Sequence, residues 1–249
     1  MPVLPASVRV AVWASSAFAG GLPVADVAAR ALPDIDHVTG LSDTLDLWRD
    51  LGEQVVLVAL PRPGDVSGMP RGGPDLLDAA TSAEEVVFVP GVGAAMVPVI
   101  EPYGPEGDQG WQASWTTYDA EPSPVHRVQA VDLSQVELSL RQDLAALTAE
   151  LAAVPGAPVS PGLGESLARD RLDTQWGMPS AVPARVLRVI DLAGSTLTLA
   201  EAGRDSELHT VDSASTLQRE RIMTRLADRA SVALAAATNV AALHLAGWR

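Results

Sequence analysis

The chain of 249 residues contains no cysteine and no lysine. Without cysteine, a single chain can form no disulfide, no thiolate nucleophile, no zinc ribbon and no iron–sulfur cluster. Without lysine, it can hold neither a lysine Schiff base nor the lysine of a phosphate-binding P-loop. Arginine is therefore the only strongly basic side chain, and lysine-based catalysis is excluded.

Positive charge is also scarce, because 17 arginines face 31 acidic residues and give a net charge of −14. A field of this sign repels nucleic acid and acidic lipid, so we predict neither a nucleic-acid nor a membrane partner. Uncharged apolar runs of the length that spans a bilayer are missing, as is a basic, then apolar, leader at the start. We expect a cytoplasmic protein with a sizeable core, since 47% of the residues are hydrophobic.

Short apolar runs alternate with helical patterns over the first 90 residues. Val8, Val10 and Val12 alternate with their neighbours and predict a first strand. The following patterns predict helix at 23–32, strand at 37–41, helix at 43–51, strand at 55–60, helix at 75–81 and strand at 86–89. This order predicts an α/β fold with a mostly parallel sheet flanked by helices.

A period of two returns at Trp111–Tyr118 and predicts a strand that is antiparallel or at an edge. Trp111 and Trp115 would share one face of it. Two tryptophans placed in this way either fill a core or present a stacking platform for a sugar or base, and the core interpretation is favoured.

The last third of the chain is predicted to be helical. Leucines and valines at steps of three and four predict a helix over 133–154, and a proline-rich stretch at 155–161 predicts a linker between domains 1–154 and 162–249. Residues 195–211 fit a helix better than a strand, but both remain open. A final alanine-rich helix carries a seam that neighbouring helices could approach closely: Met223, Leu226, Ala230, Ala233, Ala237, Val240 and His244.

The segment Pro61–Pro74 is the first candidate for a site, because eight of its fourteen residues are proline or glycine and it follows the apolar run Val55–Leu60. If that run is a parallel strand, the loop lies where α/β sheets form ligand crevices. Its candidate ligand-binding residues are Arg62, Asp65, Ser67 and Arg71. The two guanidinium groups offer planar forks for a small anionic ligand. Alternatively, an Asp-to-Arg pairing holds the loop over the sheet.

Two glycine and serine motifs come close to known signatures. Gly91-Val92-Gly93 follows a predicted strand, but Met96 stands where a dinucleotide fingerprint needs its third glycine, so a turn is favoured. Ser67 misses the G-x-S-x-G nucleophile elbow by one position and is interpreted as a turn residue.

Two charged patterns also have a functional and a plain interpretation. Asp34, Asp36 and His37 could begin a metal site, but no second histidine-rich element has ligand spacing, and we predict neither a metal nor a cofactor. Arg221, Arg225 and Arg229 recur every four residues and could meet an anionic partner. A solvated face with ion pairs is the favoured interpretation.

Three features together resemble a family of uncharacterised hypothetical proteins from actinobacteria. They are a first strand that contains a tryptophan, the Pro-Gly-Asp-Val-Ser-Gly run at 63–68 leading to Gly72-Gly73-Pro74, and the helical C-terminal third. The resemblance implies a cytoplasmic actinobacterial protein. It carries over no activity and no catalytic residue.

Taken together, these patterns predict a binding or protein-interaction module whose C-terminal helices mediate self-association or bind a partner. The alternative is an enzyme acting on a small anionic metabolite, with Arg62 and Arg71 binding the anion and Asp65 serving as acid or base. An enzyme should show a concave pocket under the Pro61–Pro74 loop, whereas a module should show an extended apolar surface on the helical region.

Overall fold

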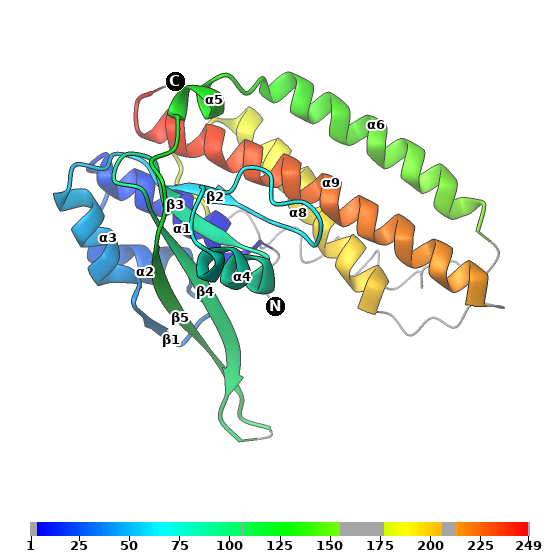
Figure 1. Ribbon diagram of the computed structural model, residues 1–249, viewed down its shortest axis with the longest axis horizontal. Helices are drawn as coiled ribbons and strands as arrows, with labels where there is room; N and C mark the ends of the chain where they lie inside the picture. The colour runs from blue at the N-terminus through cyan, green and yellow to red at the C-terminus, as the bar shows by residue number, and fades with distance from the viewer. Residues whose placement is uncertain (1–3, 106, 155–176, 206–212, 249) are drawn as a thin grey trace.

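A five-stranded sheet with the strand order β1-β5-β4-β3-β2 forms the centre of the N-terminal half (Figure 1). The computed structural model describes residues 4–105, 107–154, 177–205 and 213–248. The strands are β1 (His37–Thr39), β2 (Leu57–Ala59), β3 (Val86–Val89), β4 (Ala94–Tyr103) and β5 (Gly110–Asp119). The α/β class and the buried strand within 55–60 are confirmed.

The sheet is mixed, so the prediction of a mostly parallel sheet is wrong. Only β1 and β5 pair in parallel, and the other three neighbouring pairs are antiparallel. The connections explain two of these three pairs, because residues 90–93 and 104–109 are too few for the crossover that parallel neighbours require, whereas the connection between β2 and β3 contains α4 and is long enough for either direction. As predicted, Trp111–Tyr118 pairs antiparallel, with β4, but β1 covers its other edge.

The predicted first strand is a buried helix, α1 (Ala6–Phe18). Val8, Val10 and Val12 are fully buried, but so is Ala11 between them, and the side chain of Arg9 is only 4% exposed. A helix enclosed on all sides needs no polar face, and a run of apolar residues then alternates by chance. In Figure 1, α1 passes behind the sheet.

Helices cover both faces of the sheet. A 3₁₀ turn (Val24–Asp26), α2 (Val27–Ala31) and α3 (Leu41–Asp50) join α1 in one core. The opposite face packs against α4 (Pro74–Ala83), α5 (Val125–Gln129) and the end of α9. No helix in the described part of the chain is long and apolar enough to cross a membrane.

The C-terminal half is a layer of three helices, α6 (Leu133–Ala152), α8 (Ala184–Asp205) and α9 (Ser213–Leu245). The central helix is α9, which contacts both of the others (Figure 1). The predicted helices at 133–154 and at the C-terminus are confirmed, and residues 195–205 are helical. Residues 206–211 and the predicted linker 155–161 lie outside the described residues.

The alanine-rich seam of α9 is used within the chain. Ala230 and Ala237 are fully buried, and α9 packs against α1, α6, α8 and β2, whereas His244 at the end of the seam is exposed. A second copy cannot reach a surface that is already covered. Self-association therefore stays a prediction and would have to use another face.

The edge of the sheet at β2 is closed by a side chain of α9. The Val58 N–H donates to Asn239 Oδ1 at 2.8 Å, and Asn239 Nδ2 donates to the Val58 carbonyl at 2.9 Å. The amide thus reproduces the two hydrogen bonds that a neighbouring strand would make. This contact protects the edge and aligns α9 with the residues that precede the Pro61–Pro74 loop.

Candidate functional site

A tight turn folds the start of the Pro61–Pro74 loop back on itself. The Arg62 N–H donates to the Asp65 carbonyl and the Asp65 N–H donates to the Arg62 carbonyl, both at 2.8 Å. Pro63 and Gly64 occupy the centre of this turn, and Gly64 has φ of 87°. Proline followed by a residue with positive φ is the pattern of a type II turn, so the sequence dictates this shape.

The side chain of Arg62 points into the protein and is only 5% exposed. Its Nε donates to Ser231 Oγ at 2.9 Å, and its Nη2 donates to Glu201 Oε1 at 2.7 Å. Its Nη1 donates to Glu84 Oε2. All three nitrogens of the guanidinium are thus engaged by α9, α8 and the end of α4, and two carboxylates balance its charge.

The other predicted site residues have different environments. The Asp65 carboxylate accepts the Ser67 N–H at 2.9 Å, and hydrogen bonds from the Ser67 side chain and backbone lower the pKa of Asp65. Arg71 is exposed, and its carbonyl accepts the Glu121 N–H, which ties the far arm of the loop to the end of β5. Arg62 and Asp65 thus pair through their backbones, and their side chains diverge.

A cavity of about 280 Å³ lies between the loop and α9. Arg62, Asp65 and Ser67 line it, and Arg71 does not. Its walls come from the strands β2 and β3, the loop, α5 and the chain that follows it, and α9: Val58, Ala59, Leu60, Gly68, Phe88, Val128, Val131, Asp228, Ser231, Val232, Ala235, Ala236 and Asn239. The concave pocket expected under the loop is therefore present.

Asp228 is the most unusual residue of this cavity. It is half-buried on α9, and among the described residues no hydrogen bond or ion pair satisfies its carboxylate. Loss of water on burial raises the pKa of Asp228, and the nearby Arg62 only partly opposes this shift. A charged group held at a cavity without a partner costs stability, which is typical of binding sites.

The two halves of the chain match two models of one protein family. Residues 7–131 match the N-terminal domain of Rv1486c-like proteins, and residues 134–247 match their C-terminal domain. The chain belongs to the Rv1486c-like protein family. This membership confirms the predicted resemblance to an uncharacterised family. No functionally curated protein and no solved structure matches the chain.

The cavity lies where the two domains of the Rv1486c-like family meet. The loop, β2 and β3 belong to the N-terminal domain, and the α9 wall belongs to the C-terminal domain. The contacts of Arg62 with Ser231 and Glu201 cross the same boundary. Because binding sites often form between domains, this position supports a role for the cavity.

The lining groups favour binding over covalent chemistry. The cavity presents two carboxylates and the hydroxyls of Ser67 and Ser231, but none of the described residues that line it is a histidine. Ser231 Oγ already accepts a hydrogen bond from Arg62. A serine nucleophile needs a base that holds a proton near neutral pH, but the carboxyl that the Ser67 side chain hydrogen-bonds, that of Asp65, has a pKa lowered by that contact.

Removal of the Asp228 charge is expected to stabilise the protein. Because the native carboxyl has a pKa above its usual 3.8, the native state holds its proton more tightly than the unfolded state does. The free energy of unfolding therefore falls as the pH rises from the usual pKa of the carboxyl through its raised native pKa. Because solvent screens the half-exposed carboxylate, Asp228→Asn should raise the free energy of unfolding at pH 7 by at most about 0.5 kcal/mol and flatten its pH dependence. Urea unfolding at pH 4 to 7 measures both effects, and a destabilised variant would contradict them.

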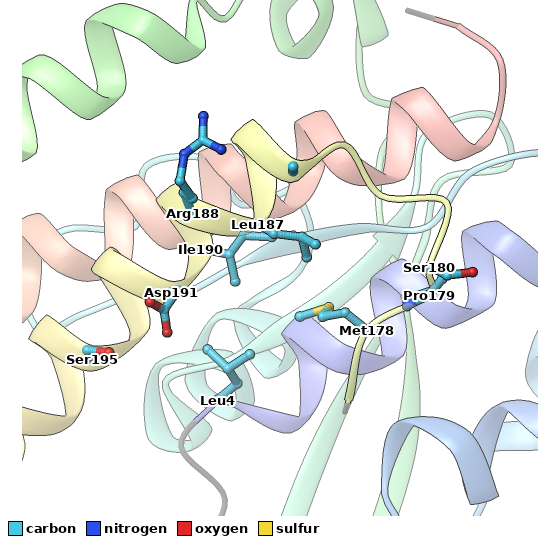
Figure 2. Close-up of a pocket in the computed structure, with 10 residues that line it drawn as sticks. Leu4, Met178, Pro179, Ser180, Leu187, Arg188, Ile190, Asp191 and Ser195 are labelled. Atoms are coloured by element: carbon cyan, nitrogen blue, oxygen red, sulfur yellow. The ribbon is translucent and has the colours of Figure 1, made fainter. Parts of the chain in front are cut away.

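Among the described residues, neither of two larger hollows is lined by a half-buried carboxylate without a partner, although the buried Arg9 Nε in one of them makes no hydrogen bond and the exposed Asp191 lines the other. A groove of about 730 Å³ near the start of α1 contains charges that have partners, such as Arg9 with Asp34. A pocket of about 440 Å³ beside α8 is mainly apolar, and in Figure 2 Leu4, Met178 and Ile190 point toward one another while Arg188 points away.

The Gly91–Gly93 turn binds an anion that belongs to the chain itself. The Val92 N–H donates to Glu53 Oε1, and the Glu53 carboxylate also accepts the Gly91 N–H, while burial raises the pKa of Glu53. A side chain at Gly91 would meet Glu53 Oε1 at 2.6 Å, and Gly93 has φ of 70°. Both glycines therefore have a structural role in the turn, as predicted.

The remaining charged motifs have structural roles. Asp34 pairs with Arg9, Asp36 accepts the Trp111 N–H at 2.9 Å, and His37 packs against the Tyr103 ring at 4.9 Å. Described His, Asp and Glu side chains form no group of three or more that could hold a metal.

The arginine stripe of α9 forms ion pairs with α6. Arg225 pairs with Glu150 at 2.7 Å and Arg229 with Asp143 at 3.7 Å, as the interpretation of a solvated, ion-paired face predicted. Trp115 is a core residue with 5% exposure.

Sequence reasoning missed the α9 side of the site. Asp228, Ser231 and Asn239 stand more than 150 residues after the loop and make no recognised motif. One signal was available, because Asp228, Val232, Ala235 and Asn239 follow at steps of three and four and so share a face. Polar residues at both ends of an otherwise apolar helical face mark a surface that contacts something other than core.

Proposed function

We propose that this protein is a ligand-binding module whose ligand occupies the cavity between the Pro61–Pro74 loop and α9. The single observation that carries the proposal is the half-buried Asp228 carboxylate, which faces the cavity without a partner. A chain under selection for stability alone would neutralise or pair such a group.

The contacts around the cavity support a preformed site. The turn at Arg62–Asp65 shapes one wall, and the paired hydrogen bonds between Asn239 and Val58 hold the opposite wall in place. A preformed cavity binds a ligand with little loss of chain entropy. Interaction with a protein partner has less support, because the large exposed apolar residues of the helical region, such as Leu138 and Leu217, stand on different helices.

Filling the cavity tests the proposal. Ala236 lines it from α9, and Ala236→Phe would place a ring in the space that the ligand needs. In a thermal-shift screen against a broad set of small metabolites, the wild type should gain several degrees with at least one compound near saturation. The Ala236→Phe variant should bind that compound with an affinity at least about 10-fold lower than that of the wild type.

Ala214→Phe is the matched control, because Ala214 is exposed near the start of the same helix. This variant should respond to ligand like the wild type. If every compound that stabilises the wild type also stabilises Ala236→Phe equally, the ligand binds elsewhere and the proposal is wrong.

A further inference from the structure

The described side chains that line the cavity carry a net negative charge, and Arg204 and Arg229 act on Asp228 from outside the lining. Arg62 is the only basic residue among its described lining residues, and Glu84 and Glu201 already balance its charge. Asp65 and Asp228 remain as the two carboxylates of the lining. Coulomb repulsion inside a partly desolvated space disfavours an anion there. This balance opposes the small anionic ligand that the two arginines of the loop suggested.

The two carboxylates differ in how much of their hydrogen-bonding capacity is free. The Asp65 carboxylate accepts the Ser67 N–H, so part of its hydrogen-bonding capacity is used. Asp228 accepts no hydrogen bond and forms no ion pair within the described chain, so its capacity is free. An ionised carboxylate accepts hydrogen bonds and cannot donate them, and its complement is a charged donor such as an ammonium group.

The rest of the cavity is apolar and small. Val128, Val131, Val232 and the Phe88 ring face it together with two alanines of α9. A volume of about 280 Å³ is below that of cavities for drug-sized molecules, so it suits a compound of roughly ten heavy atoms. The walls therefore suit a short hydrocarbon or aromatic body, and one end of the cavity suits a positive charge.

We infer that the cavity takes a small organic cation, an ammonium group carried on a short apolar body, with Asp228 as its counter-ion and Asp65 as a second negative charge. This inference rests on the proposed ligand site. Asp228 is then a residue that determines specificity, since it selects the charge of the ligand.

Matched compounds separate charge from shape. We would titrate the full-length protein with n-butylamine, n-butanol and butanoate, and with benzylamine, benzyl alcohol and benzoate, by ligand-observed NMR. The amines should bind, and the alcohols and carboxylates should bind at least about 10-fold more weakly. Asp228→Asn should weaken amine binding by about 10-fold or more, and Asp65→Asn should weaken it less.

Urea unfolding of Asp228→Asn, which should show no loss of stability, separates a loss of amine binding from a loss of folding. Asp43→Asn, at an exposed carboxylate of α3 that lines none of the three cavities described, is the control and should bind amines like the wild type. If carboxylates or alcohols bind in preference to amines and Ala236→Phe abolishes their binding, the ligand class is wrong and the proposed function stands. If none of these compounds binds and the metabolite screen also finds no ligand, both are wrong.

Discussion

Asn239→Ala is expected to lower the free energy of unfolding by about 3 kcal/mol. The substitution removes both side-chain atoms that pair with Val58, at 2.8 and 2.9 Å, and leaves a buried N–H and a buried carbonyl without partners. Each unsatisfied buried group costs about 1–3 kcal/mol. The loss of unfolding free energy should exceed that for a buried asparagine without backbone partners, because this amide makes the two hydrogen bonds that a neighbouring strand would make at the sheet edge.

Thr238→Val provides the control next to it. Thr238 is fully buried, but its hydroxyl donates to the Leu234 carbonyl of its own helix at 2.7 Å, so an isosteric methyl group leaves no orphaned backbone acceptor, because that carbonyl keeps its helical hydrogen bond. Its loss should stay below about 1 kcal/mol. Urea unfolding of both variants measures the difference. Equal losses would show that the edge of β2 does not depend on the amide.

Local patterns predicted those parts of the fold that local physics decides. The run Val55–Leu60 is apolar on both faces and forms a buried strand, and the leucine spacing over 133–154 forms α6. The Pro63-Gly64 pair forms a type II turn, because proline fixes φ at the first position and glycine accepts the positive φ at the second. In each case a short stretch of sequence contains the cause of its own conformation.

Tertiary contacts decided the rest. The period of two at Val8, Val10 and Val12 is overridden by the burial of most of α1, since a helix that is buried on nearly all sides carries little helical periodicity. The antiparallel directions of the β3–β4 and β4–β5 pairs follow from their short connections, and the length of a connection can be read only once the strand boundaries are known.

The role of Arg62 could not be predicted for a similar reason. Its partner Glu201 lies 139 residues away in sequence. The α9 residues of the cavity wall are also distant from it in sequence. A motif search near Arg62 finds the guanidinium but not the carboxylates that neutralise it.

Arg62→Met is expected to lower the free energy of unfolding by about 2–3 kcal/mol. Methionine keeps much of the apolar stem, but the hydrogen bonds to Ser231, Glu84 and Glu201 are lost. The side chains of Glu84 and Glu201 are 35% and 42% exposed and can regain water, so the loss should be smaller than for a fully buried ion pair. Arg71→Met, in the same loop but exposed, should change stability by less than about 0.5 kcal/mol.

A double-mutant cycle shows whether Arg62 joins the two domains. Glu201→Gln in the wild type and in Arg62→Met gives the coupling across the boundary, which should be about 1 kcal/mol at a side chain as enclosed as that of Arg62. A coupling near zero would mean that the pair contributes nothing beyond packing.

Because the same guanidinium lines the cavity, its loss should also loosen the wall there, and Arg62→Met should bind amines more weakly even though the cavity becomes more negative. An increase in amine affinity would instead show that charge outweighs the shape that Arg62 maintains.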